Sequence, residues 1–256
     1  MKKLKITTNI IEQHEHKGVK LEVLEYVRKK ATHGLGNTES LAYRVEEPSY
    51  AYRLLFKLQN DGIFMEGGLL HYMFGNLSIS TSSALTGLSS MMKRAAAGEG
   101  TTLTEVKGTG EVYLEPTHGE HFLIVELDND TLIADKGLFY AGSNTLKISA
   151  EMQSNISSAI FGGEGLFQTK VEGSGIAVFQ SPVPVEELVC VDLNNEKLSV
   201  DGTFAILRTG NITFKVEKSA KTLLGSAKSG EGLLQTFSGT GKVWIAPTMA
   251  VHSVMR

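Results

Sequence analysis

The sequence predicts an all-β protein built from three tandem repeats. The tripeptide Gly-Glu-Gly occurs three times, beginning at Gly98, Gly163 and Gly230, so that successive copies lie 65 and 67 residues apart. Short runs rich in β-branched and aromatic residues, such as residues 123–127 and 242–246, separate turn signals within each copy. Self-similarity at a fixed period indicates one structural unit used several times, so we expect three β units in one chain.

Each copy repeats the same order of residue types. Gly-Glu-Gly is followed by a threonine, a Gly-x-Gly pair, an aromatic residue and a proline. These residues are Thr104, Thr169 and Thr236; Gly108/Gly110, Gly173/Gly175 and Gly239/Gly241; Tyr113, Phe179 and Trp244; and Pro116, Pro182 and Pro247. The repeats therefore span residues 50–117, 120–183 and 186–248, and we expect them to unfold as one cooperative unit. We expect the three aromatic residues to be buried.

One stretch in each copy has helical periodicity. Residues 81–97, 149–161 and 216–228 place apolar side chains three or four positions apart, and a glycine follows each stretch. The sequence predicts a short amphipathic helix there in every repeat. Residues 1–49 stand outside the repeats as an N-terminal strand and loop extension, which adds strands to the first repeat or covers an edge.

Composition narrows the classes of function. The chain has 25 basic and 28 acidic side chains, a net charge of −3, and such a balance disfavours a dedicated nucleic-acid binder. Its single cysteine, Cys190, cannot form an internal disulfide and is expected to be buried in an apolar run. No stretch approaches about 18 uninterrupted apolar residues, so we expect no transmembrane segment and a cytoplasmic protein. No motif indicates a cofactor.

The run from Met92 to Pro116, with its Gly-Glu-Gly, Thr104, Gly-x-Gly and Val112-Tyr-Leu-Glu, resembles the mitochondrial-biogenesis AIM24-type family. Residues 230–247 resemble it in the same way. The resemblance implies three tandem TRAP-like units, a short variant of the double-stranded β-helix named after a tryptophan-binding RNA attenuator. It supplies no catalytic residue. Nothing matches the attenuator's ligand-contacting residues, so nucleic-acid binding by analogy with TRAP is only a second alternative.

Histidines offer the one candidate metal site of an enzyme. His14 and His16 are two positions apart, which places both rings on one side of a strand, and His121 ends a Gly-to-Pro-to-His run that loosely resembles a cupin motif. Lys20 and Leu21 occupy the places where a cupin carries glutamate. The Gly-to-Pro frame recurs without histidine in the other copies, which favours a structural role. A metal-dependent cupin-like enzyme is thus the first alternative.

The glutamates of the Gly-Glu-Gly turns form a second candidate site. Glu99, Glu164 and Glu231 occupy equivalent places, so they could converge on a cation or a basic partner around a pseudo-threefold axis. The simpler interpretation is a tight turn whose carboxylate faces solvent.

The interpretation favoured by these patterns is a non-catalytic binding or scaffold protein. The repeated positions are glycine, proline, threonine and large apolar residues, which build turns and a core, and no nucleophile or acid–base pair recurs. We expect self-association, with Met91 and Met92 of the first predicted helix at the contact, and an unknown protein partner is also possible. The alternative is a compact monomer whose residues 1–49 cover the free edge.

Overall fold

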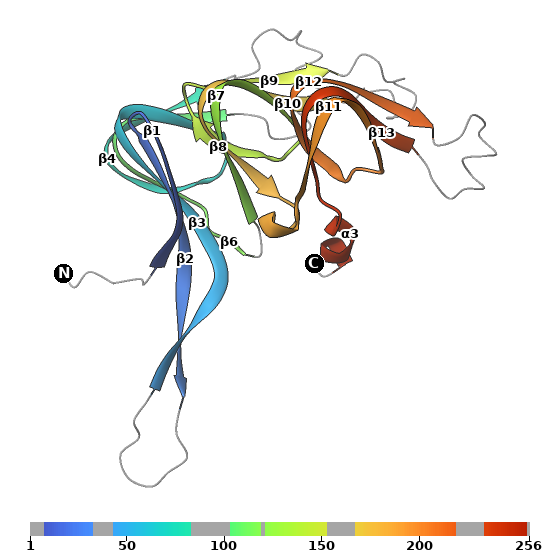
Figure 1. Ribbon diagram of the computed structural model, residues 1–256. Helices are drawn as coiled ribbons and strands as arrows, with labels where there is room; N and C mark the ends of the chain where they lie inside the picture. Colours follow the sequence, from blue (N-terminus) through green and yellow to red (C-terminus); the bar gives the residue numbers. More distant parts are fainter. Residues whose placement is uncertain are drawn as a thin grey trace. The chain divides into compact units, whose positions relative to one another are not determined.

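The computed structural model describes residues 8–32, 43–82, 103–118, 121–152, 167–218 and 233–254. The fold is all-β, as predicted: these residues form thirteen strands and only two short helical segments (Figure 1). The chain divides into two compact units. Unit 1 comprises Met1–Gly62, Gly68–Ser78 and Val106–Glu120, and unit 2 comprises Ile63–Gly67, Ile79–Glu105 and His121–Arg256.

Unit 1 is built on antiparallel neighbours along β3. Strand β1 pairs with β2, β2 pairs with β3, and β3 also pairs with β6 and β5, which in turn pairs with β4. The strands are β1 (Thr8–His16), β2 (Val19–Thr32), β3 (Tyr43–Glu66), β4 (Leu70–Ser82), β5 (Leu103–Leu114) and β6 (Thr117–His118). The ends of β3, β4 and β5 outside the unit 1 ranges belong to unit 2.

Unit 2 holds seven further strands in the order β8-β10-β7-β12-β13-β11, with β9 also paired to β10. The strands are β7 (His121–Asp135), β8 (Phe139–Ser143), β9 (Lys147–Met152), β10 (Phe167–Ser181), β11 (Val189–Asp201), β12 (Ala205–Lys218) and β13 (Leu233–Ile245). A 3-10 turn, η2 (Val185–Glu187), precedes β11, and helix α3 (Met249–Val254) follows β13.

The predicted helices are wrong where the structure describes them. Residues 149–152 belong to β9, residues 216–218 to β12 and residues 81–82 to β4. In the two later stretches the backbone groups pair in regular antiparallel register with β10 and β13, and this pairing prevails over the helical spacing of the side chains. The remaining parts of the three stretches, and the Gly-Glu-Gly tripeptides, lie outside the described residues.

The same three-strand pairing occurs three times along the chain. Strand β5 lies between β3 and β4, β10 lies between β7 and the β8/β9 pair, and β13 lies between β11 and β12. We call these groups the first, second and third segments. In each, the strand that comes last in sequence is central.

A local hydrogen bond also recurs in each segment. An asparagine with positive φ, between 51° and 57°, interrupts the first strand, and its backbone N–H donates to the hydroxyl between the two glycines of Gly-x-Gly. Asparagine tolerates the left-handed region better than other non-glycine residues. The pairs are Asn60 with Thr109 at 2.9 Å, Asn129 with Ser174 at 2.8 Å and Asn195 with Thr240 at 3.1 Å.

The Gly-x-Gly glycines are required by close backbone approach. At Gly239, φ is +136°, and an added Cβ would lie 2.2 Å from the Asn211 carbonyl oxygen. At Gly108, φ is +133°, and the same distance to the Asn76 carbonyl is 2.2 Å. A side chain would therefore force the central strand away from its neighbour.

Two strand pairings join successive segments. Ile63, Phe64 and Met65 of β3 pair with Ser143, Gly142 and Ala141 of β8. The second set is Leu132, Ile133 and Ala134 of β7, which pair with Thr209, Arg208 and Leu207 of β12. In both cases the first strand of one segment pairs with the second strand of the next. Among the described residues, β4 has only β5 as a partner and β11 has only β13.

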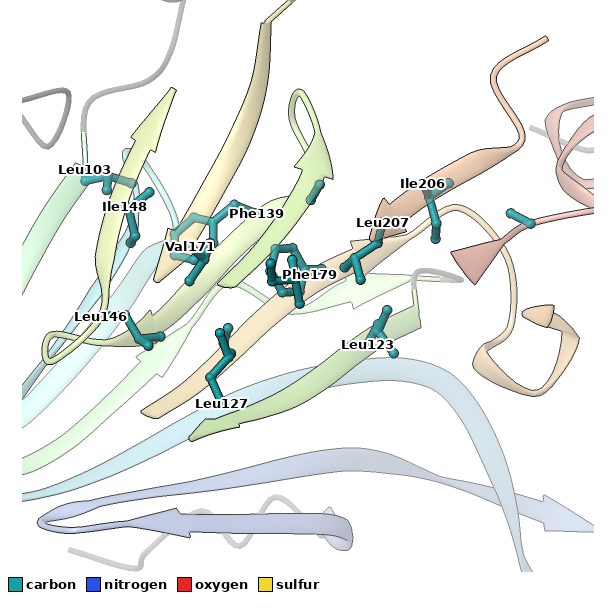
Figure 2. Packing of buried hydrophobic residues seen from close by; sticks show 14 of the residues in the cluster. Leu103, Leu123, Leu127, Phe139, Leu146, Ile148, Val171, Phe179, Ile206 and Leu207 are labelled. Carbon is teal, nitrogen blue, oxygen red and sulfur yellow. The ribbon is translucent and has the colours of Figure 1, made fainter. Parts of the chain in front are cut away.

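The main core of unit 2 consists largely of side chains from β7, β8, β9, β10 and β12. Phe139 and Phe179 meet edge to face with ring centroids 6.0 Å apart, and Leu207 packs into the same cluster (Figure 2). A smaller cluster surrounds Phe214 and Phe237, whose centroids are 5.1 Å apart. Each apolar face is thereby covered by strands that are distant in sequence.

The expected burial of the aromatic residue before each proline is correct only for Phe179, which is 1% exposed. Tyr113 and Trp244 are only partly buried. The valine immediately before each aromatic residue is completely buried instead. Successive strand residues point to opposite faces, so the valine and the aromatic residue pack on different sides of the sheet. In the second segment both sides are covered, since Phe179 belongs to the core of unit 2. These valines are Val112, Val178 and Val243.

Candidate functional site

The structure separates the three candidate metal ligands between the two units. His14 and His16 are in β1 of unit 1, and His121 begins β7 of unit 2. The Nε2 of His14 lies 2.8 Å from a carboxylate oxygen of Glu12, and the Nε2 of His16 is buried without a hydrogen-bond partner among the described residues. Among all the residues that the structure describes, no group of three or more histidine, cysteine, aspartate or glutamate side chains is arranged to hold a metal ion.

Other predicted positions have varied outcomes. Glu99, Glu164 and Glu231, and also Met91 and Met92, lie outside the described residues. Thr104, Thr169 and Thr236 are strand residues of β5, β10 and β13.

The expectation that Cys190 is buried is wrong, because its side chain is exposed. Cys190 belongs to β11, which pairs only with β13 within the described chain, so no strand covers its other edge. An apolar sequence run therefore does not guarantee burial on an edge strand.

A polar cluster in unit 1 is centred on the buried Arg53 of β3. Only 6% of the residue is exposed. Its guanidinium carbon lies 5.3, 5.5 and 6.0 Å from the ring centroids of Tyr26, Tyr72 and Tyr113. One guanidinium nitrogen donates to Nδ1 of His71 at 2.7 Å, and the other lies 3.4 Å from the Tyr72 hydroxyl. The cation is thus held by aromatic faces and by polar contacts with His71 and Tyr72.

The tyrosines of this cluster form a platform. The rings of Tyr72 and Tyr113 stack with centroids 4.4 Å apart. The Tyr113 hydroxyl donates to a carboxylate oxygen of Glu111 at 2.7 Å. Burial, followed by this hydrogen bond to a carboxylate, raises the pKa of Tyr113 far above its ordinary value, so the phenol stays protonated.

The platform continues into exposed apolar surface on β4. Tyr72 is 46% exposed and Phe74 is 76% exposed. Large exposed aromatic residues beside an arginine are typical of the contact centres of protein interfaces. The arrangement is therefore suited to binding a protein surface.

A second polar cluster lies in unit 2 where β7 meets β12. Arg208 is 4% exposed, and its guanidinium donates to the side-chain oxygen of Gln168 at 2.7 Å. The amide nitrogen of Gln168 donates in turn to Asp135 at 2.8 Å. Burial raises the pKa of Asp135 to about 6 and lowers the pKa of Arg208 to about 10, since both charged forms lose solvation.

Asp135 is one of three carboxylates at equivalent places. Each is the last residue of the first strand of its segment: Glu66 ends β3, Asp135 ends β7 and Asp201 ends β11. Burial raises the pKa of Glu66 to about 7. Asp201 is exposed, and its carboxylate accepts the backbone N–H of Gly202 at 2.9 Å. The two half-buried carboxylates, Glu66 and Asp135, are on the strands that pair with the next segment.

Sequence reasoning missed both clusters, although signals existed. Arg53 is the one charged residue between Tyr52 and Phe56. An acidic residue stands six positions after the left-handed asparagine of each segment, as Glu66, Asp135 and Asp201. Aligning these positions across the copies would have found the carboxylates, whereas nothing local reveals the partners of Arg53.

None of the helical segments in the described residues has the length and hydropathy of a membrane span.

A family model described as mitochondrial biogenesis AIM24 matches residues 43–248. An uncharacterised protein of Streptococcus pyogenes serotype M6 is 24% identical over 198 residues, which is 73% of this chain and 78% of that protein. A crystal structure of a Streptococcus pyogenes protein matches with a TM-score of 0.56 and 21% identity, covering 85% of this chain and 93% of the other. That likeness concerns the fold.

Proposed function

The chain belongs to the mitochondrial biogenesis AIM24 family, and we propose that it is a non-catalytic scaffold protein that associates with further copies of itself. In this proposal the three segments are copies of one TRAP-like unit. The contact joins strand β11 of one copy to strand β4 of the next.

The proposal rests on a pairing between successive segments. This pairing occurs twice among the described strands, whereas three segments around a ring would make it three times. The first strand of one segment pairs with the second strand of the next at β3·β8 and at β7·β12. Among the described residues, no strand takes the corresponding place beside β11 or beside β4. An unpaired strand edge presents free N–H and C=O groups, which a strand of another molecule can satisfy.

Exposure supports the same contact. In β12, which β7 covers, Leu207 is 3% exposed and Arg208 is 4% exposed. In β4, Tyr72 and Phe74 are 46% and 76% exposed. Burying two aromatic rings provides a driving force for association, because apolar surface leaves water.

The geometry of the contact determines the kind of assembly. The two surfaces differ, so the contact is heterologous, and repeating it gives a closed ring or an open filament of copies. Such an assembly has a scaffold role without any reacting group.

Light scattering at micromolar concentration tests self-association. We expect a mass well above that of the 27.7 kDa chain, falling to 27.7 kDa in Phe74→Lys, because a charge at the contact must be buried. Ile10→Lys is the matched control, since Ile10 is 54% exposed on β1, another edge strand. A wild-type mass of 27.7 kDa, or dissociation by Ile10→Lys with Phe74→Lys unaffected, would contradict the proposal.

The non-catalytic part of the proposal has its own test. We expect the purified chain to carry no stoichiometric transition metal. Bound iron, manganese, nickel or zinc that is lost in His14→Ala would instead support a metal-dependent enzyme, since histidine is a common ligand of these metals.

A further inference from the structure

We infer that Asp201 of one copy is the charge partner of the Arg53–His71 pair of the next copy. The inference rests on the proposed self-association and adds its register and the interaction that determines specificity. It names a contact between two chains and requires nothing of how the two units lie within one chain.

The register follows from matched spacing. Strand β4 runs five residues from its start at Leu70 to Gly75, and β12 runs five from Ala205 to Gly210. Strand β11 runs six residues from Asn195 to its end at Asp201, as β7 does from Asn129 to Asp135. The pairing of β7 with β12 is therefore the template for β11 on β4.

Transferring that template gives specific neighbours. In the chain, Leu132 pairs with Thr209 and Ala134 with Leu207. The equivalent pairs between copies are Leu198 with Phe74, Ser199 with Met73 and Val200 with Tyr72. Continuing by one antiparallel step, Asp201 comes opposite His71. The two most exposed aromatic residues of β4 thus come opposite the apolar residues Leu198 and Val200.

Charge complementarity supports this register. At the β7·β12 pairing, Gln168 links the terminal carboxylate of Asp135 to Arg208. At β4, Arg53 contacts the His71 ring and three tyrosines, and it forms no ion pair with any residue that the structure describes. Its Nε is buried and has no hydrogen-bond partner there.

The other charged group at this cluster is already engaged. Glu111 of β5 accepts the Tyr113 hydroxyl. A carboxylate arriving from β11 supplies the opposite charge, because an opposed pair across an interface steers association and fixes register.

A cysteine cross-link tests the register. In a Cys190→Ser background, we mix chains carrying Ser199→Cys with chains carrying Met73→Cys under mild oxidation. Directly opposed strand residues have Cα atoms about 4.5–5.5 Å apart, within disulfide reach, so we expect a covalent dimer of the two chains. Ser80→Cys replaces Met73→Cys in the control, since seven residues displace the thiol by about 23 Å.

Each outcome of the cross-linking decides the register. A dimer with Met73→Cys but not with Ser80→Cys supports it. Cross-linking with Ser80→Cys alone, or an intrachain disulfide in a chain carrying both Ser199→Cys and Met73→Cys, overturns it.

A charge exchange tests the ion pair. We expect Asp201→Lys to weaken association by at least about tenfold, because it places a cation against Arg53 and His71. His71→Asp alone should also weaken association, and the double variant should recover most of the loss. Circular dichroism and an unchanged unfolding midpoint verify that each variant is folded.

The results separate this inference from the proposal beneath it. If Asp201→Lys leaves association unchanged while Phe74→Lys abolishes it, the ion pair is wrong and self-association through β4 stands. Failure of the double variant to recover likewise overturns the pair. If the wild-type chain has a mass of 27.7 kDa, the proposed function itself fails.

Discussion

Strands β12 and β4 occupy the same place in their segments and have the same spacing to a Gly-Asn pair, yet their surroundings differ. Residues Ala205–Arg208 of β12 are each at most 4% exposed, whereas Phe74 of β4 is 76% exposed. Both strands carry large apolar side chains. The difference follows from the neighbour, because β7 pairs with β12 and no described strand takes the same place on β4.

The aspartates at the ends of β7 and β11 lead to the same conclusion for the first strand of each segment. Asp135 ends β7, is largely buried and is linked through Gln168 to Arg208. Asp201 ends β11 and is exposed. The same residue type at the same position is therefore shielded from water only where the next segment pairs with its strand. The comparison shows that the pairing between segments, rather than the local sequence, determines the environment.

The largest expected effect on stability is that of a substitution in the buried strand β12. Leu207→Ala should lower the free energy of unfolding by about 2–5 kcal/mol, because it leaves a cavity in the core of unit 2. The matched variant on β4 is Tyr72→Ala, which should cost clearly less, since 46% of Tyr72 is already in water. Urea unfolding measures both, and equal losses would contradict the contrast.

The stability of the fold should depend on pH through Asp135. Burial raises the pKa of Asp135 from 3.8 to about 6 in the folded state, so the protonated form is favoured by folding. This contribution is fully present below about pH 4 and is lost as the pH rises through about 6, with a magnitude of up to about 3 kcal/mol.

The variant Asp135→Asn measures this contribution. Between pH 4 and pH 7.5 we expect the free energy of unfolding of the wild type to fall more than that of the variant. Both aspartate variants are compared in the Phe74→Lys background, where association is removed. Asp201→Asn is the control there, because Asp201 is exposed in the single chain and its replacement should change stability by no more than about 0.5 kcal/mol. Parallel pH profiles for wild type and Asp135→Asn would refute the assignment.

Glycine substitutions compare the segments at their central strands. Gly239→Ala should destabilise by about 1–3 kcal/mol, because the backbone is left-handed and the new Cβ lies 2.2 Å from the Asn211 oxygen. Gly173→Ala should cost less, since its nearest atom, the Thr145 oxygen, is 3.4 Å away. Thermal or urea unfolding ranks them, and the reverse order would show that the second segment is packed more tightly.

The smallest expected effect is that of Phe74→Ala on the folded chain. In the Asp201→Lys background, at a concentration low enough for the weakened association to leave single chains, the free energy of unfolding should change by no more than about 0.5 kcal/mol. A larger loss would show that Phe74 packs in a core of its own chain. The contrast between a covered β12 and an exposed β4 would then be wrong.

Sequence reasoning predicted the all-β class correctly. It found the recurring Gly-x-Gly pairs without their structural role, which is the close approach of strands at Gly108 and Gly239. Helical spacing at residues 149–152 and 216–218 was misleading, since those residues pair as strands in β9 and β12. The spacing of apolar residues along the sequence does not show which backbone hydrogen bonds a distant strand will supply.

The candidate site was predictable only in part. The chain carries the acidic residue of each first strand in fixed register, so Asp201 could have been found by alignment of the copies. The aromatic surroundings of Arg53 could not, because Tyr26, Tyr72 and Tyr113 come from three different strands.

The sequence by itself determined the β class and the family, because β-forming residues and a recurring motif act over a few residues. The tertiary structure alone decided which copies of a motif are covered. Cys190 and Phe74 lie in apolar runs and are exposed, whereas Arg208 is charged and buried. Burial depends on which distant strand supplies the missing hydrogen bonds and the apolar contact, and no local pattern contains that information.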